Sequence, residues 1–417
     1  MTHIVQGASK RPVEQPVSSA AVVNPPMPIR RIASVDVYRG FVMLLMMAEV
    51  LSFSRVAKAL PDSSFWHFFS FNQSHVEWTW LSLHDMIQPS FTFLVGVVLP
   101  FSIASRKNSG AGFGAVVRHA LKRSLILVLL GIFLRSIHST QTYFTFEDTL
   151  SQIGLGYTFL VILSFYSQRV QLVTLIVLLF GYWLAFALYP LPDTSFDYAS
   201  AGVTADWDHN LRGFAAHWNK NTNLAWAFDK WFLNLFPRES VFLKNGGGYA
   251  TLSFIPTLGT MILGLFAGKA LKDSTLPSNK IKFFITTGIT LIIIGVLLHV
   301  TGINPIVKRI WTPAWTIFSG GICFLMLAFF YQLVDVSDKK KWFFFLTVIG
   351  TNSIAAYVIA DGGVMAFIAN SLYIHLGQTY DQVFGAAYAT LIKGGLVLLF
   401  AWLILYWMYR KKIFIKI

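Results

Sequence analysis

The sequence predicts an all-α polytopic membrane protein with about ten transmembrane helices and a large outer loop. Three observations support this fold class. Of the 417 residues, 55% are hydrophobic and only 12% are charged, which is too little charge to cover a soluble protein of this length. Apolar runs of membrane-spanning length recur along the chain. The runs are continuous rather than alternating, which favours helices over a closed β-barrel.

The basic net charge does not indicate a nucleic-acid partner. The value of +14 would do so in a soluble protein, but here the basic residues lie in short loops between apolar runs and indicate topology. The single cysteine, Cys323, lies inside an apolar run, which excludes an intrachain disulfide framework. No zinc motif, phosphate-binding loop or serine-hydrolase elbow is recognisable, so no metal is expected.

The elements are predicted in order as follows. Residues 1–28 are polar and lack an apolar core, which predicts a disordered cytoplasmic tail before a transmembrane domain at 29–417. Ser34 can cap the first span, and Asp36 lies in its first turn. Glu49 near the end of this span favours a retained helix over a cleaved signal peptide. The further spans are predicted at about 84–104, 124–137, 149–166, 171–189, 250–268, 283–300, 312–334, 343–360 and 383–408.

The distribution of Lys and Arg predicts the orientation. By the positive-inside rule the basic loops and both termini face the cytoplasm, here of a bacterial inner membrane. The opposite loops carry fewer basic residues per length. The longest, 190–248, is rich in Trp and is predicted to form an extracytoplasmic cap. The basic residues on the cytoplasmic side are Arg30, Arg31, the 106–123 cluster, Arg169, Lys269, Lys272, Lys280, Lys282, Lys339 to Lys341 and Arg410 to Lys412.

Chemistry is expected in the stretch 75–96, where a polar, aromatic loop becomes an apolar helix. Asp85, Gln88 and Thr92 are spaced three and four residues apart and share one helix face. An acid and an amide at the start of a span must face protein or water, because their exposure to lipid is costly. An alternative is that Asp85 only caps or charges the helix N-terminus.

Five segments carry a resemblance to a known family. They are RIASVDVYRGFVMLLM at 31–46, the stretch 75–96 with the following VVLPFS, GYATLSFIPTLGTMILGLFAG at 248–268, INPIVKRIWTPAW at 303–315 and IGTNSIAAYV at 349–358. In their order and spacing they resemble the transmembrane acyltransferases that include heparan-α-glucosaminide N-acetyltransferase and its bacterial relatives. The resemblance implies transfer of an acetyl or similar acyl group from acetyl-CoA, as co-substrate, to an amino sugar or glycan.

The resemblance also implies particular site residues. The acetyl-accepting histidine of the family, followed by Trp and Asp in the spacing HxxWxxxxxxD, falls here on His75, Trp78 and Asp85. The segment 308–312 resembles the family's Lys-Lys-Leu-Trp-Thr, and Asn352 matches an asparagine of the ninth span.

The chain departs from the family pattern in two places. It reads Ser-Gln-Ile at 151–153 where the family often has Gln-Arg-Ile. It has Glu49 and Val50 where some relatives have Asn. These departures leave a basic contact and the identity of the acceptor open.

The candidate catalytic residues are His75 and Asp85. Acyl transfer to an amine needs a nucleophile or base with a pKa near neutral, which histidine provides. Ten residues of straight helix would separate the two by roughly 15 Å, so a contact requires residues 75–84 to fold back. Without that contact, Asp85 would orient another group, such as the acceptor amine. His84, which has no counterpart in the resemblance, is expected to be a solvated residue at the helix start.

Several further residues are candidates for binding the substrates. Lys308 and Arg309, at the outer mouth of the eighth span, would suit the phosphates of coenzyme A, although they could also be membrane anchors. The full set of candidate substrate- or CoA-binding residues is Glu49, Trp78, Gln88, Arg135, Lys308, Arg309, Trp311, Asn352 and Asp361. The expected partners are membrane lipid and the acceptor, and a homodimer is left open. The alternative function is a transporter or flippase for a glycan or small anionic solute, which the lack of a clear internal repeat disfavours.

Overall fold

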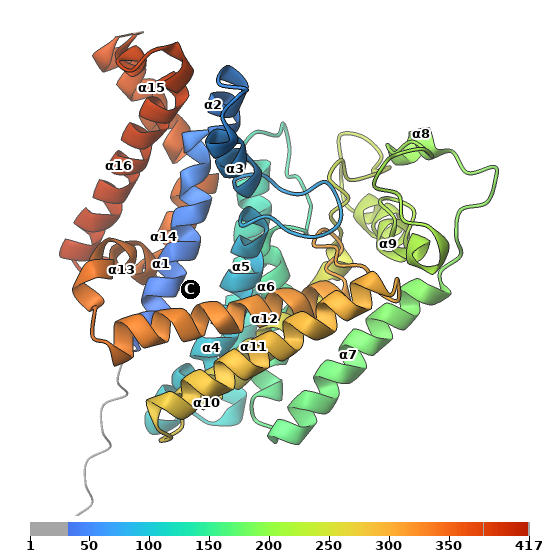
Figure 1. Cartoon of the computed structure of the whole chain (residues 1–417). Coiled ribbons are helices and arrows are strands. Elements are labelled where there is room, and N and C mark those ends of the chain that lie inside the picture. The colour runs from blue at the N-terminus through green and yellow to red at the C-terminus, as the bar shows by residue number, and fades with distance from the viewer. Residues whose placement is uncertain (1–31, 378, 416–417) are drawn as a thin grey trace, which may run out of the picture. The chain divides into compact units, whose positions relative to one another are not determined.

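The regular structure of the chain is helical, as the sequence predicts. The computed structural model describes residues 32–377 and 379–415, and β-structure in this part is limited to one antiparallel bridge between Thr79 and Val307 (Figure 1). The all-helical fold class is therefore confirmed. The predicted tail 1–28 and the basic residues Arg30 and Arg31 lie outside the described residues.

The helices have the following bounds. The α-helices are α1 (Ala33–Met47), α2 (Phe53–Ala59), α3 (Ser64–Asn72), α4 (Ile87–Asn108), α5 (Phe113–Ser136), α6 (Thr149–Leu163), α7 (Gln168–Leu188), α8 (Tyr198–Ala201), α9 (Leu224–Phe232), α10 (Phe254–Lys272), α11 (Pro277–Val300), α12 (Pro313–Phe330), α13 (Phe344–Thr351), α14 (Ser353–Asp361), α15 (Val364–Leu376) and α16 (Ala389–Arg410). Short 3₁₀ turns are η1 (Ala48–Leu51), η2 (His84–Met86), η3 (Gly213–Trp218), η4 (Leu233–Leu235), η5 (Thr251–Ser253), η7 (Lys340–Phe343), η8 (Tyr380–Gln382) and η9 (Ala386–Tyr388); the π-helical turn η6 (Tyr331–Val336) follows α12.

Fewer helices than ten qualify as membrane spans. Within the described residues, six helices are long and apolar enough to cross a membrane: His84–Asn108, Gln168–Leu188, Thr251–Lys272, Pro277–Val300, Pro313–Val336 and Ala386–Arg410. Two bent pairs, Ala33–Leu51 with Phe53–Ala59 and Lys340–Thr351 with Ser353–Asp361, raise the number to 8 if each is one span. The protein is thus multi-pass, and the predicted number of ten spans is not confirmed.

The two remaining predicted spans, 124–137 and 149–166, correspond to α5 and α6. Helix α6 has 15 residues. At this length it extends over roughly 22 Å, less than the ~30 Å of a bilayer core. Helix α5 has 24 residues but contains Arg118, Lys122 and Arg123 in its first half and Arg135 near its end, so its continuous apolar run is limited to residues 125–134. The apolar composition of the two segments did not by itself reveal that their apolar helical parts are too short to qualify as spans.

The start of α1 also differs from the prediction. Ser34 does not cap the helix, because α1 begins at Ala33 and has no side-chain cap of its own. Its first N–H groups are instead bound from a distant helix turn: the backbone N–H groups of Ala33 and Ser34 donate to the carboxylate of Asp335 at 3.2 and 3.0 Å. A long-range contact therefore replaces the expected local cap.

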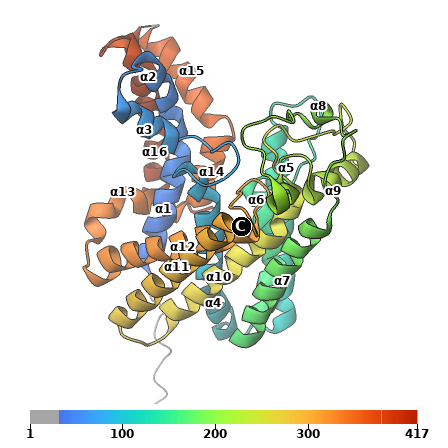
Figure 2. The ribbon, with the colours of Figure 1, turned by 45° about the vertical axis from the view of Figure 1, so that its right-hand side comes forward.

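Two helix pairs in the fold are closely packed. Helices α11 and α12 run side by side, and α10 packs along α4 (Figures 1 and 2). In the second pair, a Cβ at Gly96 would collide with the carbonyl of Met261, and one at Gly264 would collide with the carbonyl of Phe93. Small residues at such a crossing let the backbones approach closely. The close crossing holds the start of α4 against the segment that precedes α10.

The long 190–248 segment is packed against other loops. It contains α8, η3, α9 and η4, and the views agree that α8 and α9 lie beyond the C-terminal end of α7 (Figures 1 and 2). Trp78 donates its indole N–H to the carbonyl of Trp218 at 3.1 Å, and both rings are buried. The backbone N–H of Thr251 donates to the carboxylate of Asp229 in α9 at 2.9 Å. The segment therefore contacts the loops before α4 and α10, and its role as an extracytoplasmic cap stays a prediction.

Candidate active site

The loop that carries His75 folds back onto Asp85. Residues 73–83 leave α3 and run without helical structure to η2, so the two side chains meet despite their separation in sequence. The Nδ1 atom of His75 lies 2.8 Å from Oδ1 of Asp85. The contact that the motif requires is thus present.

Asp85 organises this loop from within. Its side chain is only 1% exposed. Its Oδ2 accepts the backbone N–H groups of Val76 at 3.2 Å and Ser82 at 3.0 Å, and the Ser82 hydroxyl at 3.1 Å. No side chain caps η2 or α4. Asp85 lies in the first turn of η2, and in addition its carboxylate holds the loop and His75.

Lys308 contacts both Asp85 and His75. Its Nζ lies 3.2 Å from Oδ1 of Asp85 and 3.1 Å from Nδ1 of His75, and its side chain is 5% exposed. The turn that places it is rigid, because the hydroxyl of Thr312 accepts the N–H of Val307 at 3.1 Å and donates to the carbonyl of Pro305 at 2.7 Å. Lys308 is thus an internal counter-charge of Asp85.

Arg309 joins two loops. Its guanidinium donates to the carbonyls of Gly247 at 2.8 Å and Val76 at 2.9 Å. The predicted phosphate-binding role of Lys308 and Arg309, and the alternative role as membrane anchors, both assumed cations free of internal partners. The structure gives both side chains partners within the protein.

The electrostatic surroundings keep His75 neutral with its Nε2 available. Burial lowers the pKa of His75 below its ordinary value, and the hydrogen bond with Asp85 opposes this only in part. Burial also lowers the pKa of Lys308, which the nearby carboxylate of Asp85 opposes. Two groups compete at Nδ1: the carboxylate of Asp85 at 2.8 Å favours a ring proton there, whereas the ammonium of Lys308 at 3.1 Å favours a lone pair. The shorter contact favours the tautomer with its proton on Nδ1. The Nε2 atom then carries a lone pair and has no partner among the described residues.

A cavity of about 450 Å³ opens beside these residues. This volume lies in the range of small-molecule sites. Six predicted site residues line it, from segments far apart in the chain: Glu49, His75, Gln88, Arg135, Lys308 and Asp361. The other lining residues are Met46, His84, Ile87, Glu147, Asp148, Thr149, Asn245, Gly247, Tyr249 and Tyr357.

The chain is similar in sequence to known N-acetyltransferases. Heparan-α-glucosaminide N-acetyltransferase of Homo sapiens is 23% identical over 432 residues, which cover 93% of this chain and 60% of the human protein. The enzyme of the same name from Mus musculus is 22% identical over 371 residues, which cover 79% of this chain and 53% of the mouse protein. The chain resembles this N-acetyltransferase family over most of its length. It spans less than two thirds of either relative, and no family model matches it.

Besides Asp85 and Arg309, three predicted site residues do not line the cavity. Trp78 is buried against Trp218. Trp311 is also buried and donates its indole N–H to the Thr260 hydroxyl at 3.1 Å. Asn352, at the 69° break between α13 and α14, donates to the carbonyl of Ile413 at 3.0 Å and accepts the N–H of Ile415 at 3.1 Å. The hydrogen bonds of these three side chains join them to other parts of the protein, so their contacts are structural.

His84 differs from the expectation of a solvated residue. It is only 6% exposed. Its Nε2 lies 2.9 Å from Oε1 of Glu49, and its ring centroid lies 4.6 Å from that of His75. The sequence motif contains no sign of this, because Glu49 ends the preceding span and reaches His84 only through the tertiary fold.

Sequence reasoning also missed one wall of the cavity. Glu147 and Asp148 stand directly before α6, and burial raises the pKa of each carboxyl. Tyr249 precedes α10, and burial raises the pKa of its hydroxyl, which therefore stays protonated. The signal that could have found them is the acid pair next to a predicted span, together with the position of Tyr249 inside a matched segment. Within the described residues no three His, Cys, Asp or Glu side chains are placed to hold a metal ion.

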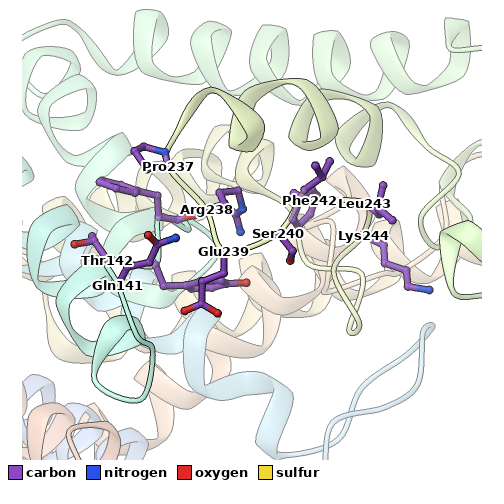
Figure 3. A pocket seen from close by; sticks show the side chains of 12 residues that line it. Gln141, Thr142, Pro237, Arg238, Glu239, Ser240, Phe242, Leu243 and Lys244 are labelled. Atoms are coloured by element: carbon purple, nitrogen blue, oxygen red, sulfur yellow. Dashed lines mark hydrogen bonds between the residues drawn. The ribbon is translucent and has the colours of Figure 1, made fainter.

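A second hollow, of about 260 Å³, lies between residues 141–144 and 237–244 (Figure 3). Its charged side chains have partners in the protein. Arg238 donates to the carbonyl of Phe144 at 2.8 Å, and Glu239 accepts hydrogen bonds from the backbone and hydroxyl of Thr140. The residues that line it include no histidine or cysteine, so the cavity beside His75 is the candidate active site.

Proposed function

We propose that this protein is a membrane N-acetyltransferase that transfers an acetyl or similar acyl group from acyl-CoA to an amino sugar or glycan. One observation carries the proposal: the buried Asp85 holds His75 at 2.8 Å, at the edge of a cavity of about 450 Å³, and Nε2 of His75 has no partner among the described residues. The similarity to two named N-acetyltransferases over most of the chain supports the same reaction class.

The side chains of the cavity fit the acyl end of such a donor. His75 Nε2 could attack the acyl carbon or take a proton from the acceptor as it attacks. Tyr249 keeps its proton because burial raises its pKa, so its hydroxyl can donate a hydrogen bond to a developing oxyanion. Arg135 is exposed and lines the cavity; no hydrogen bond or close ion pair joins it to the described residues, although it interacts electrostatically with Glu147 and Asp361. Arg135 is therefore better placed than Lys308 or Arg309 to meet a phosphate of coenzyme A.

Purified protein should release free coenzyme A from acetyl-CoA in the presence of glucosamine and form N-acetylglucosamine. A thiol reagent measures this release with little background, because the single cysteine, Cys323, is buried. Glucose, which lacks the amine, is the matched control and should give no N-acetylated product. A protein that releases no coenzyme A with any amine, yet moves a glycan across a vesicle membrane, would instead be a transporter or flippase.

We also propose a location in a bacterial inner membrane, with both termini cytoplasmic and residues 190–248 outside. The basic residues at the ends of α10 and α16, Lys269, Lys272 and Arg410, support this orientation. Cysteines introduced at the exposed positions Ser195 and Ser274 should react with a membrane-impermeant reagent from outside and from inside, respectively. Labelling of both from the same side, or the reverse pattern, would contradict the orientation.

A further inference from the structure

The cavity contains a second imidazole–carboxylate pair besides His75 and Asp85. His84 and Glu49 come from different elements, η2 and η1, and lie 2.9 Å apart. His84 is 6% exposed, whereas the Glu49 side chain is 56% exposed, and both line the cavity. The pair therefore lies at the boundary between the protein interior and the cavity, as the first pair does.

The two pairs share one kind of contact, in which a carboxylate lies beside one nitrogen of the imidazole. Asp85 lies beside Nδ1 of His75, and Glu49 lies beside Nε2 of His84. The other nitrogen, Nε2 of His75 and Nδ1 of His84, has no hydrogen-bond partner among the described residues. An acid that accepts a proton from one nitrogen leaves a lone pair on the other. Because the ring centroids are 4.6 Å apart, one small group can contact both imidazoles.

The chemistry of an amine acceptor requires two proton transfers. A protonated amine must lose one proton to expose its lone pair. It must lose a second proton when the C–N bond to the acyl carbon forms. A hydroxyl acceptor loses only one proton, so a single base would be enough for it.

We propose that His84, held by Glu49, takes the first proton from the ammonium of the acceptor, and that His75 serves the acyl transfer and receives the second. The inference rests on the proposed function. His84 accepts the proton at Nδ1, and the freed amine forms the C–N bond as the bond from the acyl carbon to its leaving atom breaks. The second proton goes to Nε2 of His75. One of the two protons ends on the thiol of coenzyme A, and the other passes to water through the open cavity.

The charges around His84 suit a cationic acceptor. The titratable and charged groups that line the same cavity are Glu49, His75, Arg135, Glu147, Asp148, Tyr249, Lys308, Tyr357 and Asp361, and Asp85 lies next to His84 in η2. Lys308 is already paired with Asp85. Burial raises the pKa of Glu147 and Asp148, which leaves Glu49 and Asp361 as the acids that outnumber Arg135 among these lining residues. This balance favours an ammonium over a neutral hydroxyl, so the site selects a primary amine that arrives protonated.

Two amines of different basicity test this role. Glucosamine is largely protonated at low pH and must be deprotonated before it reacts, whereas aniline is already neutral in the same buffers. With His84→Gln we expect glucosamine turnover to fall about 100-fold at low pH, the size of a general-base contribution, while aniline turnover changes little. The glucosamine deficit should shrink as the pH rises and the free amine becomes abundant. Glu49→Gln, which keeps the imidazole, should shift glucosamine turnover in the same direction by a smaller factor.

The outcomes separate this inference from the proposed function. An equal loss with both amines at every pH, or no loss with either, overturns the role of His84 while the enzyme activity stands. If the His84→Gln protein does not fold, Glu49→Gln takes its place in the experiment. A loss of glucosamine turnover in Glu49→Gln that does not depend on pH also overturns the inference. A wild-type protein that acetylates neither amine overturns the proposed function, and this inference with it.

Discussion

His75→Ala should abolish acyl transfer while the protein still folds and binds acyl-CoA. The change removes the nitrogen that faces the cavity, and general-base or nucleophilic contributions of this kind are worth about 10²–10⁴-fold in rate or more. Folding should survive because the His75 side chain is 38% exposed and Lys308 stays beside Asp85 at 3.2 Å. Release of coenzyme A with glucosamine measures the loss. His67→Ala, which removes an exposed histidine of α3 outside the cavity, is the matched control and should keep full activity.

The same residue has two possible roles, which the donor alone distinguishes. If the imidazole attacks the thioester, wild-type protein given only acyl-CoA should release coenzyme A and carry a labile acyl group on the peptide that contains residue 75. If it acts as a general base, neither should occur until the acceptor is added. Near-normal turnover by His75→Ala would contradict both roles and move the search to His84 and Glu49.

The pH dependence follows from the direction of the pKa shift. The active form of His75 is neutral, and burial lowers its pKa, so the ring stays neutral to lower pH than a free histidine does. The acid limb of the kcat/KM profile should therefore lie below about 6.5, the ordinary value for histidine. In Asp85→Asn the ring loses the carboxylate that supports its protonated form, so turnover should fall, by less than in His75→Ala.

Lys308→Met should destabilise the fold by about 3–5 kcal/mol, because it leaves the carboxylate of Asp85 buried without its cation. Both side chains are almost fully buried, and they lie 3.2 Å apart. The free energy of unfolding in detergent, measured with denaturant, checks the value. Lys340→Met is the matched control: Lys340 pairs with Asp338 at 2.8 Å, but both side chains are exposed, so the loss should be at most about 1 kcal/mol.

The double variant Lys308→Met with Asp85→Asn tests the cause of this destabilisation. It removes the negative charge together with its partner, so its loss should be smaller than the sum of the two single losses. Strict additivity, or a Lys308→Met loss no larger than that of Lys340→Met, would show that the two side chains do not form a buried ion pair.

The sequence alone determined the fold class and pointed to the first pair of candidate site residues. Repeated apolar runs require helices in a bilayer, because backbone groups in lipid must be satisfied within the segment, and the described residues are helical as expected. The spacing between His75 and Asp85, together with the family resemblance, was enough to identify these two residues as candidates. Composition and spacing are properties of a segment by itself, and therefore the sequence reveals them.

Tertiary structure decided everything that depends on contacts between distant segments. The fold-back of residues 73–83 brings His75 within 2.8 Å of Asp85, and the turn before α12 brings Lys308 to the same carboxylate, 223 positions later in the chain. The contact of Glu49 with His84 joins the end of one span to the start of the next. Helix α6 is too short to count as a span, which is one reason why fewer than ten spans qualify among the described residues. From the sequence alone, a charged side chain is expected to be solvated. Only the packing of the helices shows which charged side chains are buried and therefore need a partner.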